Sequence, residues 1–335
     1  MRLVSFVPPD APSRAGLLLG ATVLDLAIAA PLVFEEAEGL QWDMRSLLQG
    51  DQEQVSLESA AMIAAAVTSI VGDGEALVPD AIAGGMMIGG SQLLLPLAQV
   101  RLRAPLPHPT SLREFEAFEQ HALALRRYAN ETLPAQWYRR PAFFFANHQA
   151  IIGPDEEVVL PAGNEFDMGI GVACVIGRTV SGLEPVAAHA AIAGYILINS
   201  WCARDEEAHL RPLGLGPAAA RFATSLGPAL VTPDELEIYT DDDGRLNLAL
   251  TLTVNGIRRV QTNTALATYS FPELIAAASR FTTLIPGDII ATGPCDGGSL
   301  LMLNGPNGPW LEPDAVIEVS ATGLGILRNR IGNES

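Results

Sequence analysis

The stretch "EFDMGIGVACVIG", residues 165–177, decides the fold of this chain. Ile170, Val172 and Cys174 occupy every second position and alternate with a second set of residues. Such alternation predicts a half-buried strand. The second set begins acidic and then loses its side chains: Glu165, Asp167, Gly169 and Gly171. Glycine weakens the interior of a strand, so two glycines on one face need a reason.

The composition indicates a well-cored globular protein that binds a small molecule. Of the 335 residues, 49% are hydrophobic, and the formal net charge is −18. Such an acidic surface repels the phosphates of nucleic acid, so a nucleic-acid partner is not expected. The chain has no lysine, and all 20 basic residues are arginines. Schiff-base catalysis and a lysine base are therefore excluded.

The N-terminal stretch "MRLVSFVPPDAPSRAG" lacks the pattern of a signal peptide, and the most apolar runs are interrupted by Gly, Pro or polar residues. We therefore expect a cytoplasmic protein without membrane contact. The three cysteines are far apart, which favours neither a disulfide framework nor a zinc site.

Three alternating prolines in "RLRAPLPHPTS", residues 101–111, predict a stiff extended segment, because proline cannot continue a helix. We place a domain boundary there, between a small α/β domain at 1–104 and a larger domain at 105–335. In the first domain, "SLESAAMIAAAVTSIV" predicts a helix over 56–71 that begins at the N-cap Ser56.

Beyond the boundary, residues 112–130 show helical spacing of apolar residues, and Ser111 with Glu114 matches a capping box. The remainder is rich in predicted strands. "LNLALTLTV" at 246–254 and "IRRVQTN" at 257–263 predict a hairpin that turns at Asn255-Gly256.

Several blocks in order give the chain its resemblance to a known family. They include "PLPHPTSLREFEAFEQH", "QWYRRPAFFFANHQAIIGP", "FDMGIGVACVIG", "GYILINSWCARDEE", "LTVNGIRRVQTNT" and "LIPGDIIATG". From about residue 105 to 331 the chain resembles the fumarylacetoacetate hydrolase (FAH) family. The resemblance implies an α+β fold with a mixed β-roll core and peripheral helices, usually a homodimer. It also implies hydrolysis, decarboxylation or keto–enol isomerisation of small dicarbonyl acids, commonly with Mg²⁺ or another divalent ion.

The family's functional positions carry over only in part. Its catalytic histidine matches His121, and the carboxylate ahead of that histidine matches Glu114. Its E-x-E metal ligands fall on Gly169 and Gly171, and its last metal ligand falls on Ser200. The family lysine lies near Ala220, with a possible one-residue deletion beside it, the threonine after T-G falls on Pro294, and the carboxylate that orients the histidine falls near Met302. We therefore expect no bound cofactor, and Mg²⁺ or another divalent ion only if the site is not degenerate.

Simpler interpretations stand beside the functional ones. Glu114 can be a capping residue, and Arg204 with Asp205 can form an internal ion pair instead of binding substrate. A four-residue shift of the strand would let Glu165 and Asp167 replace the missing carboxylates, because such a shift keeps the same face. The remaining candidate substrate-binding residues are Trp201 and Tyr138.

Three functions remain open on this basis. We favour a repurposed, metal-independent enzyme that enolises, decarboxylates or cyclises a small dicarbonyl or enol-type substrate. In it His121 acts as acid and base, Glu114 belongs to the catalytic site, and Arg204 holds an anionic group. The alternatives are a non-catalytic binding or regulatory protein, including the inactive partner of an active paralogue, and an ordinary metal-dependent hydrolase of carbon–carbon bonds.

Overall fold

Strand β12 (Phe166–Ile176) is the strand that the opening stretch predicts, and it lies between β13 (Ile192–Ala203) and β17 (Asp288–Ala291). All of its residues are buried, so the half-buried prediction is wrong. Ile170 and the other apolar residues on its side of the strand pack into the larger core. Ala173, on the opposite side, packs with residues of the N-terminal elements. Alternating side chains predicted that one face of this strand is exposed to solvent. In the structure, other chain segments cover the glycines on that face.

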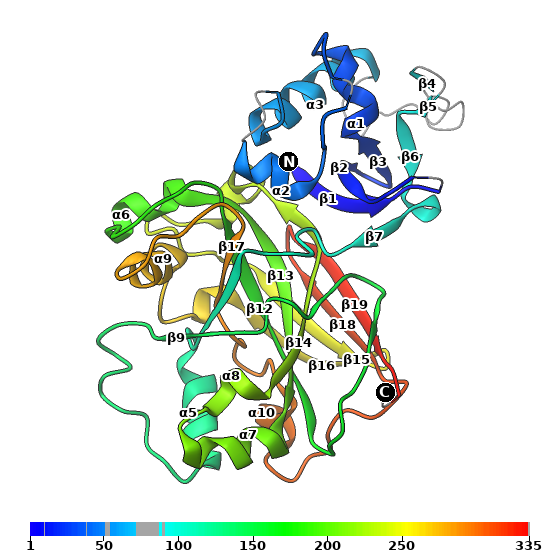
Figure 1. Cartoon of the computed structure of the whole chain (residues 1–335). Coiled ribbons are helices and arrows are strands. Elements are labelled where there is room, and N and C mark those ends of the chain that lie inside the picture. Colours follow the sequence, from blue (N-terminus) through cyan, green and yellow to red (C-terminus); the bar gives the residue numbers. More distant parts are fainter. Residues whose placement is uncertain (10, 38, 51–53, 72–86, 89–90, 334–335) are drawn as a thin grey trace.

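The computed structural model describes residues 1–9, 11–37, 39–50, 54–71, 87–88 and 91–333. β12 belongs to a 12-stranded sheet that runs the length of the molecule (Figure 1). Its other strands along the sheet are β6 (Leu94–Pro96), β3 (Thr22–Asp25), β2 (Arg14–Leu19), β1 (Arg2–Val7), β14 (Arg221–Val231), β8 (Ser111–Phe115) and β9 (Phe143–Phe145), with β7 (Arg101–Arg103) on β1 and β10 (Ile151–Ile152) on β14.

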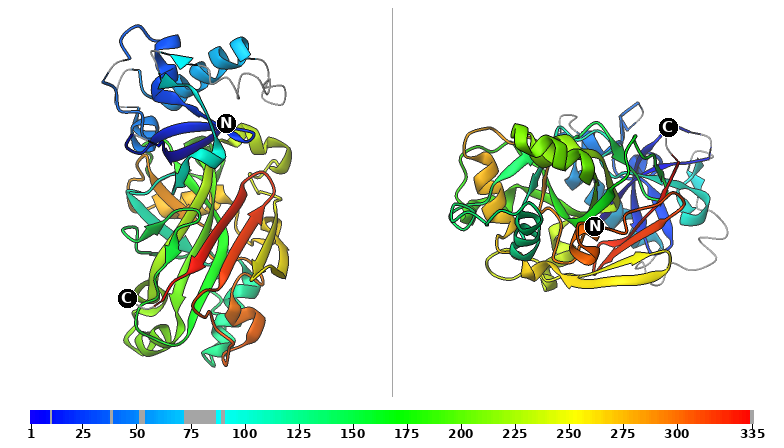
Figure 2. Two further views of the ribbon diagram at one scale, coloured as in Figure 1. Left: turned by 90° about the vertical axis from the view of Figure 1, so that its right-hand side faces the viewer. Right: turned by 90° about the horizontal axis from the view of Figure 1, so that it is seen from below.

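A second, five-stranded sheet faces the long strands of the first (Figure 2). It contains the predicted hairpin, with Asn255 and Gly256 at positive φ in the turn. Its strands in order are β11 (Glu157–Val158), β19 (Gly325–Ile331), β18 (Val316–Ala321), β15 (Ala249–Val254) and β16 (Ile257–Asn263); a separate pair is β4 (Met87–Ile88) with β5 (Ser91–Gln92). The mixed α+β architecture with a β-rich core is confirmed.

The N-terminal strands continue the main sheet, because β1 pairs with β14. The helix predicted at 56–71 is α3 (Leu57–Val71), and the Ser59 amide donates to the Ser56 hydroxyl, which confirms the cap. The domain boundary stays a prediction.

Four helices gather at the end of the main sheet that lies farthest from the N-terminal elements, and they surround the candidate site (Figure 1). They are α5 (Glu119–Tyr128), α7 (Arg204–Leu210), α8 (Gly216–Ala220) and α10 (Leu300–Asn304). The others are α1 (Leu26–Ala29), α2 (Met44–Gln49), α6 (Pro185–Ala188) and α9 (Phe271–Ser279). No helix in the described ranges is long and apolar enough to cross a membrane.

The helix predicted at 112–130 is wrong in its first part. Residues 111–115 form β8, and α5 begins only at Glu119. Ser111 donates to Asp288 Oδ1 at 2.6 Å and makes no capping box with Glu114. β8 forms because it pairs with β17 and β9, and long-range pairing of this kind overrides local helical spacing. Glu114 and His121 therefore do not share a helix face.

Candidate functional site

The positions assigned to metal ligands by resemblance do meet in space. Gly169 on β12 lies directly opposite Ser200 on β13. The Ser200 hydroxyl donates to Glu114 Oε2 at 2.7 Å, although 86 positions separate the two residues. Three elements far apart in the sequence thus contribute to one buried place, and the chemistry of its side chains decides what it can hold.

The two glycines leave no empty space for the lost carboxylates. A Cβ atom on Gly169 would lie 2.7 Å from Pro294 Cγ, and one on Gly171 would lie 2.5 Å from the carbonyl oxygen of Gly293. Both distances are far below van der Waals contact. The segment that carries Gly293 and Pro294 therefore occupies the volume that side chains at 169 and 171 would need.

The retained carboxylate, Glu114, forms an ion pair with Arg221. Arg221 Nη2 donates to Glu114 Oε1 at 3.0 Å, and its Nε lies 3.3 Å from the same atom. Both side chains are almost fully buried, at 3% and 1% exposure. A buried guanidinium beside the carboxylate would repel a divalent cation, since like charges interact strongly in a low-dielectric interior.

These residues do not fit a divalent metal ion. Mg²⁺ requires one or two carboxylates that are free to coordinate, and Glu114 is committed to Arg221 and Ser200. Among the described residues, no three His, Cys, Asp or Glu side chains gather in an arrangement that could hold a metal.

His121 lies on α5 with its side chain buried. Its Nδ1 is 3.2 Å from Met302 Sδ, at the position where the family's orienting carboxylate is expected. A thioether sulfur can only accept a hydrogen bond, so Nδ1 carries the hydrogen and Nε2 presents its lone pair. Burial lowers the pKa of His121, and the charges of Arg204 and Arg221 lower it further. Together they bring this pKa to about 3. The imidazole is therefore neutral at physiological pH.

Arg204 is the centre of a buried ion-pair network. Its Nε donates to Asp167 Oδ2 at 2.8 Å, and its Nη1 donates to Glu207. Glu207 also pairs with Arg211. Burial alone would raise the pKa of Glu207, but the positive charges of Arg204 and Arg221 outweigh burial and hold it at about 2.

The neighbouring acidic candidates have structural roles. Asp167 accepts hydrogen bonds from the amides of Met168, Leu300 and Leu301, and so it caps the start of α10. Asp205 does not pair with Arg204 in the structure; its carboxylate accepts from the Asn164 amide. The strand register leaves Asp167 opposite Cys202, so the four-residue shift that would restore a carboxylate pair does not occur.

Two other candidate binding residues lie away from this network. The Trp201 indole is fully buried and donates to the Ser225 hydroxyl at 2.8 Å, as a core residue does. Tyr138 is 53% exposed and donates to Glu119. The structure therefore pairs Glu114 with Arg221 and places Arg204 on the wall of a cavity that neither Trp201 nor Tyr138 lines.

Two buried polar atoms of this region have no partner among the described residues, His121 Nε2 and Arg221 Nη1, whereas Arg204 Nη2 lies 2.8 Å from Asp167 Oδ2 in a buried ion pair. Burial lowers the pKa of the His121 imidazole most, and the positive charges of Arg204 and Arg221 act in the same direction. Buried polar groups are nearly always hydrogen-bonded, and orphaned ones mark the place of a water, an ion or a ligand. A lone-pair acceptor and one cationic N–H donor are thus left without partners in this buried region.

A cavity of about 290 Å³ lies beside these groups, between α5, α7 and α10. Arg204 and Glu207 line it, together with Leu125, which is one helical turn beyond His121 on α5. Glu165 lines it as well. The remaining lining residues include Tyr128, Arg211, Leu301 and Trp310.

The tight packing of the glycines gives a first testable consequence. We expect Gly171→Ala to lower the free energy of unfolding by about 1–3 kcal/mol, because the added methyl meets backbone atoms that cannot rotate away. Chemical denaturation followed by circular dichroism measures it. A Gly171→Ala protein as stable as the native chain would show that the 292–294 segment yields easily and that room for a ligand exists.

The comparisons with known proteins agree with the fold. Residues 112–332 match the model of the fumarylacetoacetate (FAA) hydrolase C-terminal family. The chain is 30% identical over 218 residues to 2,4-didehydro-3-deoxy-L-rhamnonate hydrolase of Sphingomonas sp. (strain SKA58), covering 64% of this chain and 70% of that one. It is 34% identical over 162 residues to the mitochondrial oxaloacetate tautomerase FAHD2B of Homo sapiens, 48% of this chain and 49% of the relative.

Among solved structures, a putative HpcE protein from Mycobacterium smegmatis superposes with a TM-score of 0.73 at 24% identity, and both chains are fully covered. Maleylpyruvate hydrolase from Sphingobium sp. SYK-6, in complex with manganese(II) ion and pyruvate, superposes with a TM-score of 0.68 at 22% identity, again over the whole of both chains. At these identities the likeness shows the fold.

The fold places the chain among α+β proteins of the FAH type. The chain belongs to the fumarylacetoacetate hydrolase family. The named relatives are a hydrolase and tautomerases that act on small organic acids, which supports an enzyme of this general type. The chain spans about half the length of the tautomerase relatives.

One residue of the site was missed by sequence reasoning. Arg221 directly follows Ala220, near which the family lysine was placed, and it is the nearest basic residue in that block. A search for any cation near that position would have found it. Its pairing with Glu114, 107 positions away, depends on tertiary structure alone.

Proposed function

We propose that this chain is a metal-independent enzyme that catalyses proton transfer at the carbon next to a carbonyl group of a small oxo acid. The observation that carries this proposal is a pair of unpartnered buried atoms, Nε2 of the neutral His121 imidazole and Nη1 of the Arg221 guanidinium. This set supplies a base and an anion holder without any metal ion.

The reaction follows from these groups. The unpartnered Nη1–H of Arg221 donates to the substrate carbonyl oxygen, and the charge of Arg204 attracts the substrate carboxylate. His121 Nε2 takes the proton from the adjacent carbon, the C–H electron pair becomes the C=C bond, and the carbonyl oxygen takes the negative charge. Arg221 stabilises that enolate oxygen, as a preformed donor does in a site without water. The imidazolium then returns the proton to oxygen or to carbon, which completes enolisation.

Binding of an anionic substrate would also raise the pKa of His121. A group with a pKa of about 3 is a weak base, and general bases work best when their pKa is near the operating pH. Burial holds this pKa down most, and the charges of Arg204 and Arg221 add to that effect. A bound carboxylate would offset the arginine charges, so the pKa of His121 would rise when the substrate binds. The free protein is therefore set to bind an anion first.

The cavity between α5, α7 and α10 is the entry that this proposal requires. Arg204 lines this cavity, and its positive charge lowers the pKa of the His121 imidazole, after burial itself. The Leu125 side chain lies one turn from His121 on the same helix face and would have to turn aside for the substrate. The volume of about 290 Å³ fits a compact acid of a few carbon atoms.

A second candidate is a binding or regulatory protein without turnover. Neither His121 nor Glu114 lines the cavity, and ion pairs occupy the arginines on one side. In that case the cavity binds a small acid and no proton is exchanged. The metal-dependent hydrolase is disfavoured, because the donor set around Glu114 does not fit a divalent ion.

The test is proton exchange in D₂O. The native chain is incubated with a panel of 2-oxo acids, including oxaloacetate and pyruvate, and loss of the C3 proton signal is followed by NMR. We expect exchange that EDTA does not slow, and we expect His121→Gln to reduce its rate by about 100-fold or more. The matched control is His108→Gln, a change of an exposed histidine in the 105–110 segment, which leaves the rate unchanged.

Binding of an acid without exchange would favour the regulatory protein. Exchange that EDTA abolishes would revive the metal-dependent enzyme. The homodimer and the cytoplasmic location remain predictions, and the first is tested by light scattering of the purified chain.

A further inference from the structure

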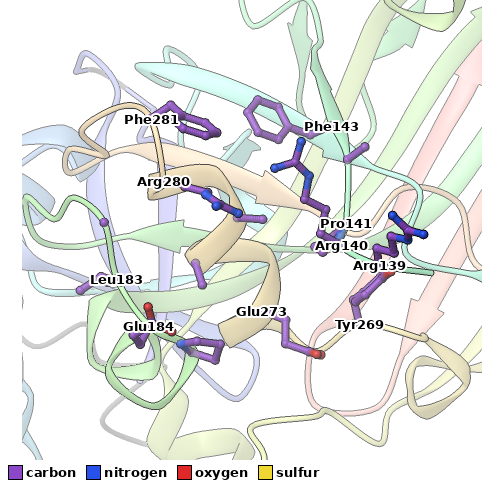
Figure 3. A pocket seen from close by; sticks show the side chains of 15 residues that line it. Arg139, Arg140, Pro141, Phe143, Leu183, Glu184, Tyr269, Glu273, Arg280 and Phe281 are labelled. Carbon is purple, nitrogen blue, oxygen red and sulfur yellow. The ribbon is translucent and has the colours of Figure 1, made fainter. Parts of the chain in front are cut away.

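A second cavity of about 630 Å³ opens on the flank of the molecule formed by α6 and α9, away from the four helices of the candidate site (Figures 1 and 3). Its walls come from three segments that are distant in sequence: residues 139–143, residues 182–185, and residues 269–281, which contain α9. None of the residues of the candidate site lines it. Its volume lies in the range of small-molecule sites in proteins.

Three arginines line this cavity: Arg139, Arg140 and Arg280. In Figure 3, Arg140 and Arg280 reach toward the same space from two different segments. All three are exposed to solvent, and none of them forms an ion pair with the described residues. Such a grouping of free cations is unexpected in a chain with a formal net charge of −18.

The two carboxylates on the wall do not neutralise this group. Glu273 accepts the Ser270 amide as part of the capping box of α9, which fixes its carboxylate at the start of the helix. Glu184 directly precedes α6 and makes no ion pair with the described residues. The cationic N–H groups are thus available to an external anion, and guanidinium groups bind carboxylates and phosphates in a bidentate manner.

Aromatic rings stand beside the arginines. The Arg280 guanidinium lies 5.3 Å from the centre of the Phe281 ring, and Phe281 is 84% exposed. Phe143 and Tyr269 also line the cavity. Exposure of a large apolar ring to water is unfavourable in free energy, and stacking against a planar ligand would bury that ring.

We propose that this cavity binds a small planar ring compound that carries two or more negative charges, either a nucleotide or an aromatic polycarboxylate. The arginines hold the charges and Phe281 with Phe143 stacks on the ring. This second site does not rest on the proton-transfer activity proposed above, because it shares no residue with that site.

Calorimetric titration of the full chain with four probes tests the proposal. The probes are ADP, trimellitate, adenosine and tripolyphosphate, so that ring and charge are present together or separately. We expect ADP or trimellitate to bind more tightly than both adenosine and tripolyphosphate, and we expect added salt to weaken that binding. Preference for ADP identifies a phosphate ligand, and preference for trimellitate identifies a carboxylate ligand.

Two variants locate the binding. Arg140→Gln combined with Arg280→Gln should weaken it about tenfold or more, since each removes a charged hydrogen bond. Phe281→Ala should weaken the ring-bearing probes and leave tripolyphosphate unchanged. Arg258→Gln, an exposed arginine on β16, is the matched control and should have no effect.

Three outcomes would overturn the proposal. The first is absence of binding by all four probes. The second is equal binding by the native chain and the double arginine variant. The third is a change of oligomeric state on gel filtration of the Phe281→Ala protein, which would show that a second copy of the chain covers this cavity.

Discussion

Arg221→Met is expected to lower the free energy of unfolding by about 3–5 kcal/mol, one of the two largest effects predicted for this chain. The substitution leaves the Glu114 carboxylate buried with only the Ser200 hydroxyl as partner. Taking a charge out of water without a counter-charge costs several kcal/mol. Urea denaturation followed by tryptophan fluorescence measures the loss.

The double variant Glu114→Gln with Arg221→Met separates charge from packing. It removes both charges, and the amide of Gln can still accept from Ser200, so we expect it to be more stable than Arg221→Met alone. The exposed pair Arg330 and Asp314 is the matched control, because surface pairs contribute about 0–1 kcal/mol. Losses that simply add in the double variant would show that Glu114 and Arg221 do not interact, and the account of the filled site would fail.

The second large effect is a loss of stability in mild acid caused by His121. Burial, with the charges of Arg204 and Arg221, holds its pKa at about 3 in the folded chain, whereas an exposed histidine has a model value of 6.5. Between these values the unfolded chain binds a proton that the folded chain does not. Stability from this group is therefore present above about pH 6.5 and is lost as the pH falls toward 3.

From pH 7 to pH 5 this contribution amounts to about 2 kcal/mol. Other groups titrate as well, so the test compares the native chain with His121→Gln, which has no imidazole at this place. The native chain should lose about 2 kcal/mol more than the variant over that interval. Parallel pH profiles for the two proteins would mean that His121 is solvated and that its environment is not the one described.

The sequence predicted the elements whose signals are local. β12, the β15–β16 hairpin and α3 with its Ser56 cap follow from alternation, turn residues and capping. The family was also predicted from sequence, since its blocks contain several turns at fixed spacing.

Glu114 shows where local reasoning fails. The spacing from Ser111 to Glu114 matches a helix cap, yet both residues lie on β8, because pairing with β17 and β9 dominates. A residue beyond 280 in the sequence decides the conformation at 111, and no short window contains that information.

The site was predicted by position and not by chemistry. The family resemblance placed the E-x-E ligands on Gly169 and Gly171; in the structure Pro294 and Gly293 pack against these glycines, and Arg221 pairs with Glu114. A guanidinium can replace the charge of a metal ion, but it donates hydrogen bonds where a metal accepts ligands. The replacement therefore favours enolate stabilisation over activation of water.

Titration of the metal-free chain with Mn²⁺ tests the central claim most directly. The chain is dialysed against EDTA, passed into buffer without chelator, and titrated with Mn²⁺ by calorimetry and electron paramagnetic resonance. We predict no saturable Mn²⁺ binding in the native chain and the same result for Glu114→Gln. Binding of one Mn²⁺ per chain that disappears in Glu114→Gln would contradict the claim that Arg221 and Pro294 have replaced the metal.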